Sequence, residues 1–218
     1  MMIENYCPST DPYLNIVYHD DEILVLDKPS GLLSVPGKGP LLTDCLEKRA
    51  CEKFGNARTV HRLDMDTSGL IIMGLSKFSH RHLSLQFQNR NVGKKYCARI
   101  FGQIKKDEGV IDLPLICDWP NRPKQMVDFE NGKPSQTEWR VIKRLENECY
   151  VELMPLTGRS HQLRVHLKEL GHPILGDRFY AHVKALAMSD RLCLHSTSLT
   201  IMHPIEKVKM TFDSPVPF

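Results

Sequence analysis

The sequence has no long apolar segment. No run approaches the ~18 consecutive apolar residues that a membrane-spanning helix requires. The opening residues, MMIENYCPSTDPY, also lack the basic stretch followed by an apolar stretch that marks a secretory signal. We therefore expect a protein with neither a membrane span nor a secretory signal.

Cysteine is present, but never in a paired spacing. The sequence has seven cysteines, an odd number, and none of them belongs to a C-x-x-C pair. This pattern argues against a disulfide framework and against a thiolate zinc site. Free thiols are typical of a reducing compartment, so we expect a cytoplasmic protein.

Charge of one sign is not in large excess. The 29 Lys and Arg residues nearly balance the 26 Asp and Glu residues, which leaves a formal net charge of +3. Such a small excess neither requires nor excludes a nucleic-acid partner, because a local basic patch matters more than the total. A chain of 218 residues without repeats or linkers predicts one domain, 1–218.

Hydrophobic periodicity predicts a strand-rich chain. Residues 16–18 and 23–26 read as a hairpin, and the apolar run 70–75 is typical of a buried strand. Further strands are expected around Tyr96 and at 137–142, 150–154, 192–201 and 208–212. Many strands with few helices favour an α+β fold with a mixed, largely antiparallel sheet.

Three helices are expected among these strands. The first two are predicted at 42–54 and 77–90. Their expected end residues are Thr43 or Asp44 and Gly55 for the first helix, and Ser76 for the second. The third is expected to be capped by Ser160, to end at Gly171 and to bury Leu163, Leu167 and Leu170.

The segment His61–Gly69, with the sequence HRLDMDTSG, is the most informative stretch. Asp, Thr, Ser and Gly favour a turn because their side chains bond nearby backbone and Gly accepts positive φ. On composition alone, Asp64 and Asp66 therefore suit local capping. They also suit binding of a hard cation such as magnesium, although no further carboxylate motif is evident to complete such a site.

The same segment resembles the catalytic motif of the RluA family of pseudouridine synthases. The resemblance is literal at seven positions, H-R-L-D followed by T-S-G. Four other segments agree with the family in order, and together the matches extend over about residues 15–213. These segments are Asp27–Leu32, Lys95–Tyr96, Gly158–His166 and His172–Asp177.

The resemblance implies a fold, an activity and a substrate. It implies the pseudouridine synthase fold, with flanking helices around a sheet and a central active-site cleft. No N-terminal S4 RNA-binding domain is expected before the motif at Asp27–Leu32. The segment Cys117–Gln125 is most similar to the dual-specificity member of the family, which acts on a 23S ribosomal RNA hairpin and on the tRNA anticodon stem-loop. A monomer is the expected state.

The implied reaction suits a carboxylate nucleophile without a cofactor. Pseudouridine formation breaks the N1–C1′ bond, turns the uracil and rejoins it through C5, so nothing is oxidised or hydrolysed overall. The sequence has no glycine-rich phosphate loop or metal cluster, and we expect neither cofactor nor metal. In the family the nucleophile is the aspartate of H-R-L-D, which corresponds to Asp64.

Two further catalytic residues follow from the resemblance. Burial disfavours a charged carboxylate, so a cation is needed nearby, and the family counterpart of Arg164 fills that role. Helical spacing places Arg164 beside the predicted leucine stripe, although a surface ion pair is the commoner fate of such an arginine. Tyr96 matches the tyrosine that packs on the target uracil in the family, whereas an isolated strand tyrosine is usually half-buried packing.

Further residues are expected to contact RNA. The family places an arginine at Arg62 to fill the gap left by the flipped nucleotide. His61 suits orientation of the loop better than acid–base chemistry, and Leu175 is expected to help wall the uracil pocket. Lys95, Arg122 and Lys124 are candidate phosphate ligands because each lies near an aromatic residue in sequence.

Two other functions compete with this interpretation. A metal-dependent phosphohydrolase or nuclease could use Asp64, Asp66 and His61, and a chelator would abolish its activity. A non-catalytic RNA-binding protein could keep the fold after losing the reaction. The presence of Asp64, Tyr96 and Arg164 together argues against the second alternative.

Overall fold

A computed structural model describes residues 6–218, and these residues form two compact units. One, here called the discontinuous unit, takes in the described residues up to Lys94 together with His195–Pro217. The other, the inserted unit, is Lys95–Leu194 with Phe218. Whether the two make up one catalytic domain, as the sequence predicts, stays a prediction. The expected lack of a secretory signal falls partly on residues 1–5, which lie outside the described residues.

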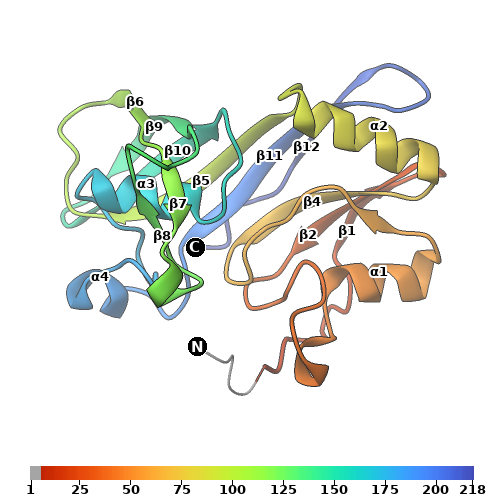
Figure 1. Cartoon of the computed structure of the whole chain (residues 1–218), viewed down its shortest axis with the longest axis horizontal. Coiled ribbons are helices and arrows are strands. Elements are labelled where there is room, and N and C mark those ends of the chain that lie inside the picture. Colours follow the sequence, from red (N-terminus) through yellow and green to blue (C-terminus); the bar gives the residue numbers. More distant parts are fainter. Residues whose placement is uncertain (1–5) are drawn as a thin grey trace. The chain divides into compact units, whose positions relative to one another are not determined.

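The discontinuous unit is built on a sheet with the strand order β1-β2-β4-β11 (Figure 1). In addition, β3 pairs with β4, and β12 pairs with β11. All of these pairings are antiparallel except β4 with β11. The strands are β1 (Ile16–His19), β2 (Ile23–Lys28), β3 (Arg58–Thr59), β4 (Ser68–Gly74), β11 (Leu194–Met202) and β12 (Lys209–Asp213).

Two helices cover opposite faces of this sheet. Successive side chains of a strand point to opposite faces, and both faces of β2 and β4 are apolar, so each face needs a cover. One face packs against Leu83 of α2 (Lys77–Gln88), and the other packs against Leu46 and Ala50 of α1 (Leu46–Phe54). The strand that follows the loop at residues 60–67 is therefore packed on both faces.

The strands of the inserted unit pair antiparallel in the order β5-β10-β9-β6. A separate two-stranded sheet pairs β7 with β8. Leu163 and Leu167 of α3 pack in one core with residues of β5, β9 and β10. The elements are β5 (Gly93–Phe101), β6 (Glu108–Asp112), β7 (Leu115–Cys117), β8 (Gln125–Val127), β9 (Gln136–Arg144), β10 (Glu148–Pro155), α3 (Gln162–Glu169) and α4 (Val183–Ala187).

Most predicted elements are present, and two helix starts were predicted wrongly. The first helix begins at Leu46 because Cys45 is its N-cap, and residues Pro40–Leu42 form a separate 3-10 turn. The third helix is not capped by Ser160. Its N-cap is His161, which has a left-handed backbone and makes no side-chain cap.

Ser76 caps α2 as predicted, and its hydroxyl accepts from the Ser79 amide. The expected stripe of α3 is confirmed for Leu163 and Leu167, but Leu170 is 37% exposed. The strands β6, β7 and β8, the helix α4 and a 3-10 turn at Trp119–Asn121 were not predicted. Within the described part of the chain, no helix is both long and apolar enough to cross a bilayer.

Candidate functional site

The motif His61–Gly69 forms the loop that leads into β4. The Thr67 amide donates to the carbonyl of Asp64 at 3.1 Å, which closes a tight turn through Met65 and Asp66. Asp64 is half-buried at the first position of this turn, whereas Arg62 is exposed. The turn predicted from the sequence is therefore confirmed, and Asp64 is its first residue.

A buried lysine anchors this turn to the segment that ends β2. Lys28 is fully buried, and its ammonium donates to the carbonyls of Pro29, Leu32 and Met65 at 2.9, 2.7 and 2.9 Å. The Gly31 amide also donates to the carbonyl of Met65 at 2.9 Å. An ammonium carries three donors, so the three carbonyls match its geometry and compensate for its burial.

Two serines fix the backbone on either side of Asp64. Ser34 accepts from the Leu63 amide at 3.1 Å and donates to the Leu63 carbonyl at 2.7 Å. The Ser30 hydroxyl donates to the carbonyl of Asp66 at 2.7 Å. Because these bonds all use the loop backbone, they set the position of Asp64 without occupying its carboxylate.

His61 supports the loop from the other side. Its Nε2 accepts a hydrogen bond from the Ile72 amide at 3.1 Å, and its ring stacks on Phe87 of α2 at 4.4 Å between centroids. Burial, assisted by the charge of Lys94, lowers the pKa of His61 to about 3. The ring is therefore neutral at physiological pH and suits the structural role that the sequence favoured for it; contact with RNA stays a prediction.

The T-S-G end of the motif is fixed by a chain of buried polar groups. Ser68 Oγ lies 2.8 Å from His195 Nδ1, and His195 Nε2 lies 2.9 Å from Ser214 Oγ. The Ser214 hydroxyl donates to Asp27 at 2.6 Å. Since Ser214 gives its only proton to Asp27, it must accept from His195 Nε2.

Gly69 is required where β4 meets β11. Its φ is +110°, and a Cβ atom there would collide with the backbone of Ser196. Ser196 is its partner in the parallel pairing of the two strands. The glycine of the motif thus permits a close approach of two backbones, which holds Ser68 against His195.

In the inserted unit, Arg164 lies in a buried cage. Asp177 binds it through both carboxylate oxygens, with Nε to Oδ2 at 2.8 Å and Nη2 to Oδ1 at 2.7 Å. The rings of Phe179 and Tyr180 lie 5.2 and 5.3 Å from its guanidinium carbon. Arg164 is 2% exposed, so it is not the surface ion pair that commonly forms on a helix.

Tyr180 joins this cage to the loop that carries Arg122 and Lys124. Its hydroxyl accepts from the Gln125 amide at 2.8 Å and lies 2.7 Å from His161 Nδ1. The loop between β7 and β8 is thereby tied to Arg164. The structure brings these sequence-predicted residues into one region of the inserted unit.

Within that loop, Arg122 and Lys124 differ in their surroundings. Arg122 is exposed and lies over the ring of Trp119 at 4.7 Å, and its Nε donates to the Trp119 carbonyl. Lys124 is half-buried. Trp119 is itself 64% exposed, which leaves an aromatic surface beside a cation, as stacking on a nucleobase requires.

The other predicted residues lie on β5 and in the core. Tyr96 is half-buried and packs against the core that α3 completes. Lys95 lies 2.9 Å from Glu152. Burial alone would raise the pKa of Glu152, but hydrogen bonds from Lys95 and Arg140 lower this pKa below its ordinary value. Leu175 is fully buried, so its contact with a uracil stays a prediction.

Lys28, Ser34, Asp177, His195 and Ser214 were not predicted as site residues. Lys28 and Asp177 fell inside quoted family motifs, which was the only signal available for them. Among residues 6–218, no group of three or more His, Cys, Asp and Glu side chains is placed to hold a metal ion.

Comparison with known proteins identifies the chain's relatives. The family described as RNA pseudouridylate synthase matches residues 22–169. The protein named dual-specificity RNA pseudouridine synthase RluA from Escherichia coli K12 is 53% identical over 219 aligned positions, with all of both chains covered. The protein of the same name from Pasteurella multocida is 51% identical, again over the full length of both chains.

Solved structures agree with these matches. Human RNA pseudouridylate synthase domain containing 1 superimposes with a TM-score of 0.81 and 32% identity, over 97% of this chain and 86% of that one. Human RNA pseudouridylate synthase domain containing 4 superimposes with a TM-score of 0.74 and 26% identity, over 93% of this chain and 88% of that one. The predicted fold class and the resemblance read from the motifs are both confirmed. The chain belongs to the RNA pseudouridylate synthase family and is an isomerase.

Proposed function

We propose that this isomerase converts specific uridines to pseudouridine in a 23S ribosomal RNA hairpin and in the tRNA anticodon stem-loop, with Asp64 as its nucleophile. The two substrates are inferred from the full-length likeness to relatives that are named dual-specificity synthases. The observation that carries the role of Asp64 is its place in a turn that buried Lys28 and two serines hold through the backbone.

The reaction needs one carboxylate in a fixed position. The N1–C1′ bond breaks, the freed uracil turns, and C5 joins C1′; the proton on C5 leaves and N1 ends protonated. The Asp64 carboxylate attacks either C1′ of the ribose or C6 of the base, and both routes use the same charged group. A turn held at several backbone atoms positions that group without a cost in loop ordering at the moment of reaction.

Arg164 and Tyr96 complete the proposed catalytic set. Asp177 holds the Nε–Nη2 edge of Arg164, which fixes the plane of the guanidinium. An arginine held in this way can keep Asp64 charged, because its fork cannot deprotonate. The Tyr96 ring packs on the target uracil, and its hydroxyl takes part in removing the proton from C5.

The remaining predicted residues act on RNA outside the reacting base. Arg62, which is exposed beside the turn, fills the gap left by the flipped nucleotide. Arg122 and Lys124 bind phosphates, with Trp119 available for stacking. Lys95 adds charge beside Tyr96. The protein acts as a monomer in the cytoplasm, and it needs no cofactor.

The test is release of tritium from uracil C5. Anticodon stem-loop and 23S hairpin RNAs labelled at C5 are incubated with wild type and with Asp64→Asn, each with and without chelator. We expect release from both RNAs with wild type at either chelator condition, and none with Asp64→Asn, which should still bind RNA. Release by Asp64→Asn near the wild-type rate would refute the assignment. Binding without release by wild type would indicate the non-catalytic alternative or another RNA.

A further inference from the structure

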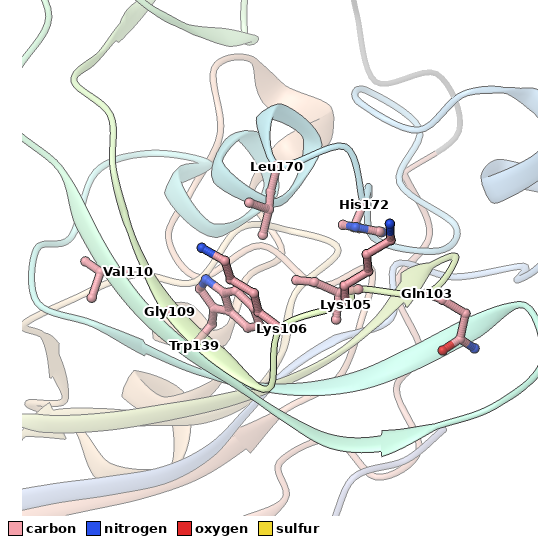
Figure 2. Close-up of a pocket in the computed structure, with 9 residues that line it drawn as sticks. Gln103, Lys105, Lys106, Gly109, Val110, Trp139, Leu170 and His172 are labelled. Atoms are coloured by element: carbon pink, nitrogen blue, oxygen red, sulfur yellow. The ribbon is translucent and has the colours of Figure 1, made fainter.

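A pocket of about 410 Å³ opens in the inserted unit, away from the residues proposed for catalysis. It lies between the loop that follows β5, the start of β6 and the end of α3 (Figure 2). Arg164 is in the first turn of α3, whereas Leu170, which lines the pocket, is the C-cap. These two residues are separated by about 9 Å along the helix. A volume of this size falls within the range of about 300–1,000 Å³ for ligand sites.

A tryptophan with an unused donor forms the floor of the pocket. Trp139 is 3% exposed, and in Figure 2 its indole nitrogen lies on the side of the ring that faces Leu170. Among residues 6–218, this nitrogen has no hydrogen-bond partner, and it is not sealed from solvent. A buried tryptophan usually pairs its N–H, so this donor points to a ligand that accepts a hydrogen bond.

Positive charge also lines the pocket. Lys105 and Lys106 both line the pocket, together with His172. His172 Nδ1 lies 2.9 Å from the carbonyl oxygen of Phe101. Because a carbonyl oxygen can only accept, Nδ1 donates this hydrogen bond. A ligand in the pocket would meet one neutral N–H and two ammonium groups.

The loop that carries the lysines is held in place. Arg144 donates to the carbonyls of Ile104 and Lys106 at 3.3 and 3.0 Å, and it pairs with Asp107 at 2.8 Å. The backbone of Asp107 is also fixed, because its carbonyl accepts a hydrogen bond from the Val141 amide at 2.6 Å. The cations are therefore presented by an ordered loop, and the nearest acidic side chain in sequence is already paired.

We propose that this pocket binds a phosphate group, and that its occupant is a backbone phosphodiester of the RNA substrate outside the target nucleotide. The inference rests on the proposed function for the identity of the occupant. Trp139 would donate to a phosphate oxygen, and Lys105 and Lys106 would supply the charge. Side-chain N–H groups and lysines are common phosphate ligands, and such contacts position an RNA without reading its sequence.

Trp139 itself reports on the pocket. The chain has two tryptophans, Trp119 and Trp139, so Trp119→Phe leaves Trp139 as the sole indole. Its emission is followed while inorganic phosphate replaces chloride at constant ionic strength, and separately while the anticodon stem-loop is added. We expect a saturable change with each ligand. Both changes should vanish when Lys105→Ala and Lys106→Ala are added to the Trp119→Phe protein.

Salt dependence of RNA binding provides a second readout. Each lost phosphate contact reduces the magnitude of the slope of log K against log salt by about 0.7 to 0.9, and the double lysine variant, which loses the one phosphate in the pocket, should show a reduction of that size. The matched control is Lys143→Ala with Lys184→Ala, which removes two exposed charges of the inserted unit outside the pocket. The control should keep the wild-type change in Trp139 emission, and its slope should fall by less.

The outcomes separate this inference from the proposed function. A response to inorganic phosphate without one to RNA, and with an unchanged salt slope, would overturn RNA as the occupant. No response to either ligand, or equal responses in the double lysine variant, would overturn the site. Tritium release by wild type tests the catalytic proposal alone.

Discussion

Asp177 binds Arg164 through two hydrogen bonds of 2.8 and 2.7 Å, with both side chains almost fully excluded from solvent. Asp177 also accepts from the amides of Phe179 and Tyr180. One carboxylate therefore orients the arginine and shapes the aromatic cage around it. The proposed partner of Asp64 is thus itself held by a second aspartate.

Replacing Asp177 should remove both effects. Asp177→Asn keeps the shape but leaves a buried guanidinium without this counter-charge, so we expect a loss of about 3–5 kcal/mol in the free energy of unfolding. Tritium release should fall as well, because Arg164 loses its fixed plane. Urea unfolding and C5 release measure the two effects. The exposed Asp190→Asn serves as control and should change neither, and a wild-type result for Asp177→Asn would contradict the role of the pair.

Lys28 should be intolerant of an isosteric apolar replacement. Lys28→Met leaves three carbonyls that lose an ammonium donor in a fully buried place, so a loss of about 3 kcal/mol or more is expected. The exposed Lys38→Met is the control, and its stability should stay within about 0.5 kcal/mol of wild type. Equal stabilities of the two variants in urea would show that Lys28 does not anchor the turn.

Two glycines with similar φ angles allow backbone strain to be distinguished from steric collision. Gly69 and Gly39 have φ values of +110° and +107°, but only Gly69 has backbone atoms in the space where a Cβ would lie. Gly39→Ala should cost about 1 kcal/mol for the positive φ, whereas Gly69→Ala should cost more than about 4 kcal/mol. Thermal and urea unfolding give the comparison. Similar costs at both positions would mean that the contact with Ser196 is unimportant.

The free energy of unfolding should decrease as the pH is lowered, because His61 is neutral in the folded chain. Burial, with help from Lys94, lowers the pKa of this ring to about 3 from the ordinary value of 6.5. Between these values the unfolded chain takes up a proton that the folded chain excludes, so acidification favours unfolding. The contribution from His61 should be about 2 kcal/mol between pH 6.5 and pH 5.

His61→Gln isolates this contribution, because its amide oxygen can still accept from the Ile72 amide. The free energy of unfolding of wild type should decrease more steeply with falling pH than that of the variant. Urea unfolding at a series of pH values measures the difference. Parallel curves for the two proteins would show that His61 is not a neutral buried ring.

Local patterns predicted the parts of the fold that local physics determines. The apolar run at 70–75 gave the buried strand β4, and Ser76 gave the start of α2, since a cap needs only neighbours in sequence. Ser160 failed as a cap because the Gln162 side chain accepts from the Arg159 amide and His161 adopts a left-handed backbone. Neither feature has a signature in the sequence.

In the candidate site, too, the sequence indicated some residues and missed others. The motif located Asp64, and the resemblance located Tyr96 and Arg164. Their supports escaped prediction because the partners of a buried charge lie far away in sequence, as Met65 does from Lys28 and Asp177 does from Arg164. Periodicity carries no information about such contacts, and only the folded arrangement of the backbone reveals them.

The discontinuous unit has a consequence for synthesis on the ribosome. Asp27 and Ser68 are made early, but His195 and Ser214, which link them, are made more than a hundred residues later. Chains grow at about 5–20 residues per second, so this link forms several seconds after the turn at Asp64 has left the exit tunnel. The polar contacts that fix the T-S-G end of the turn therefore form only once Ser214 has been made, long after Asp64 itself.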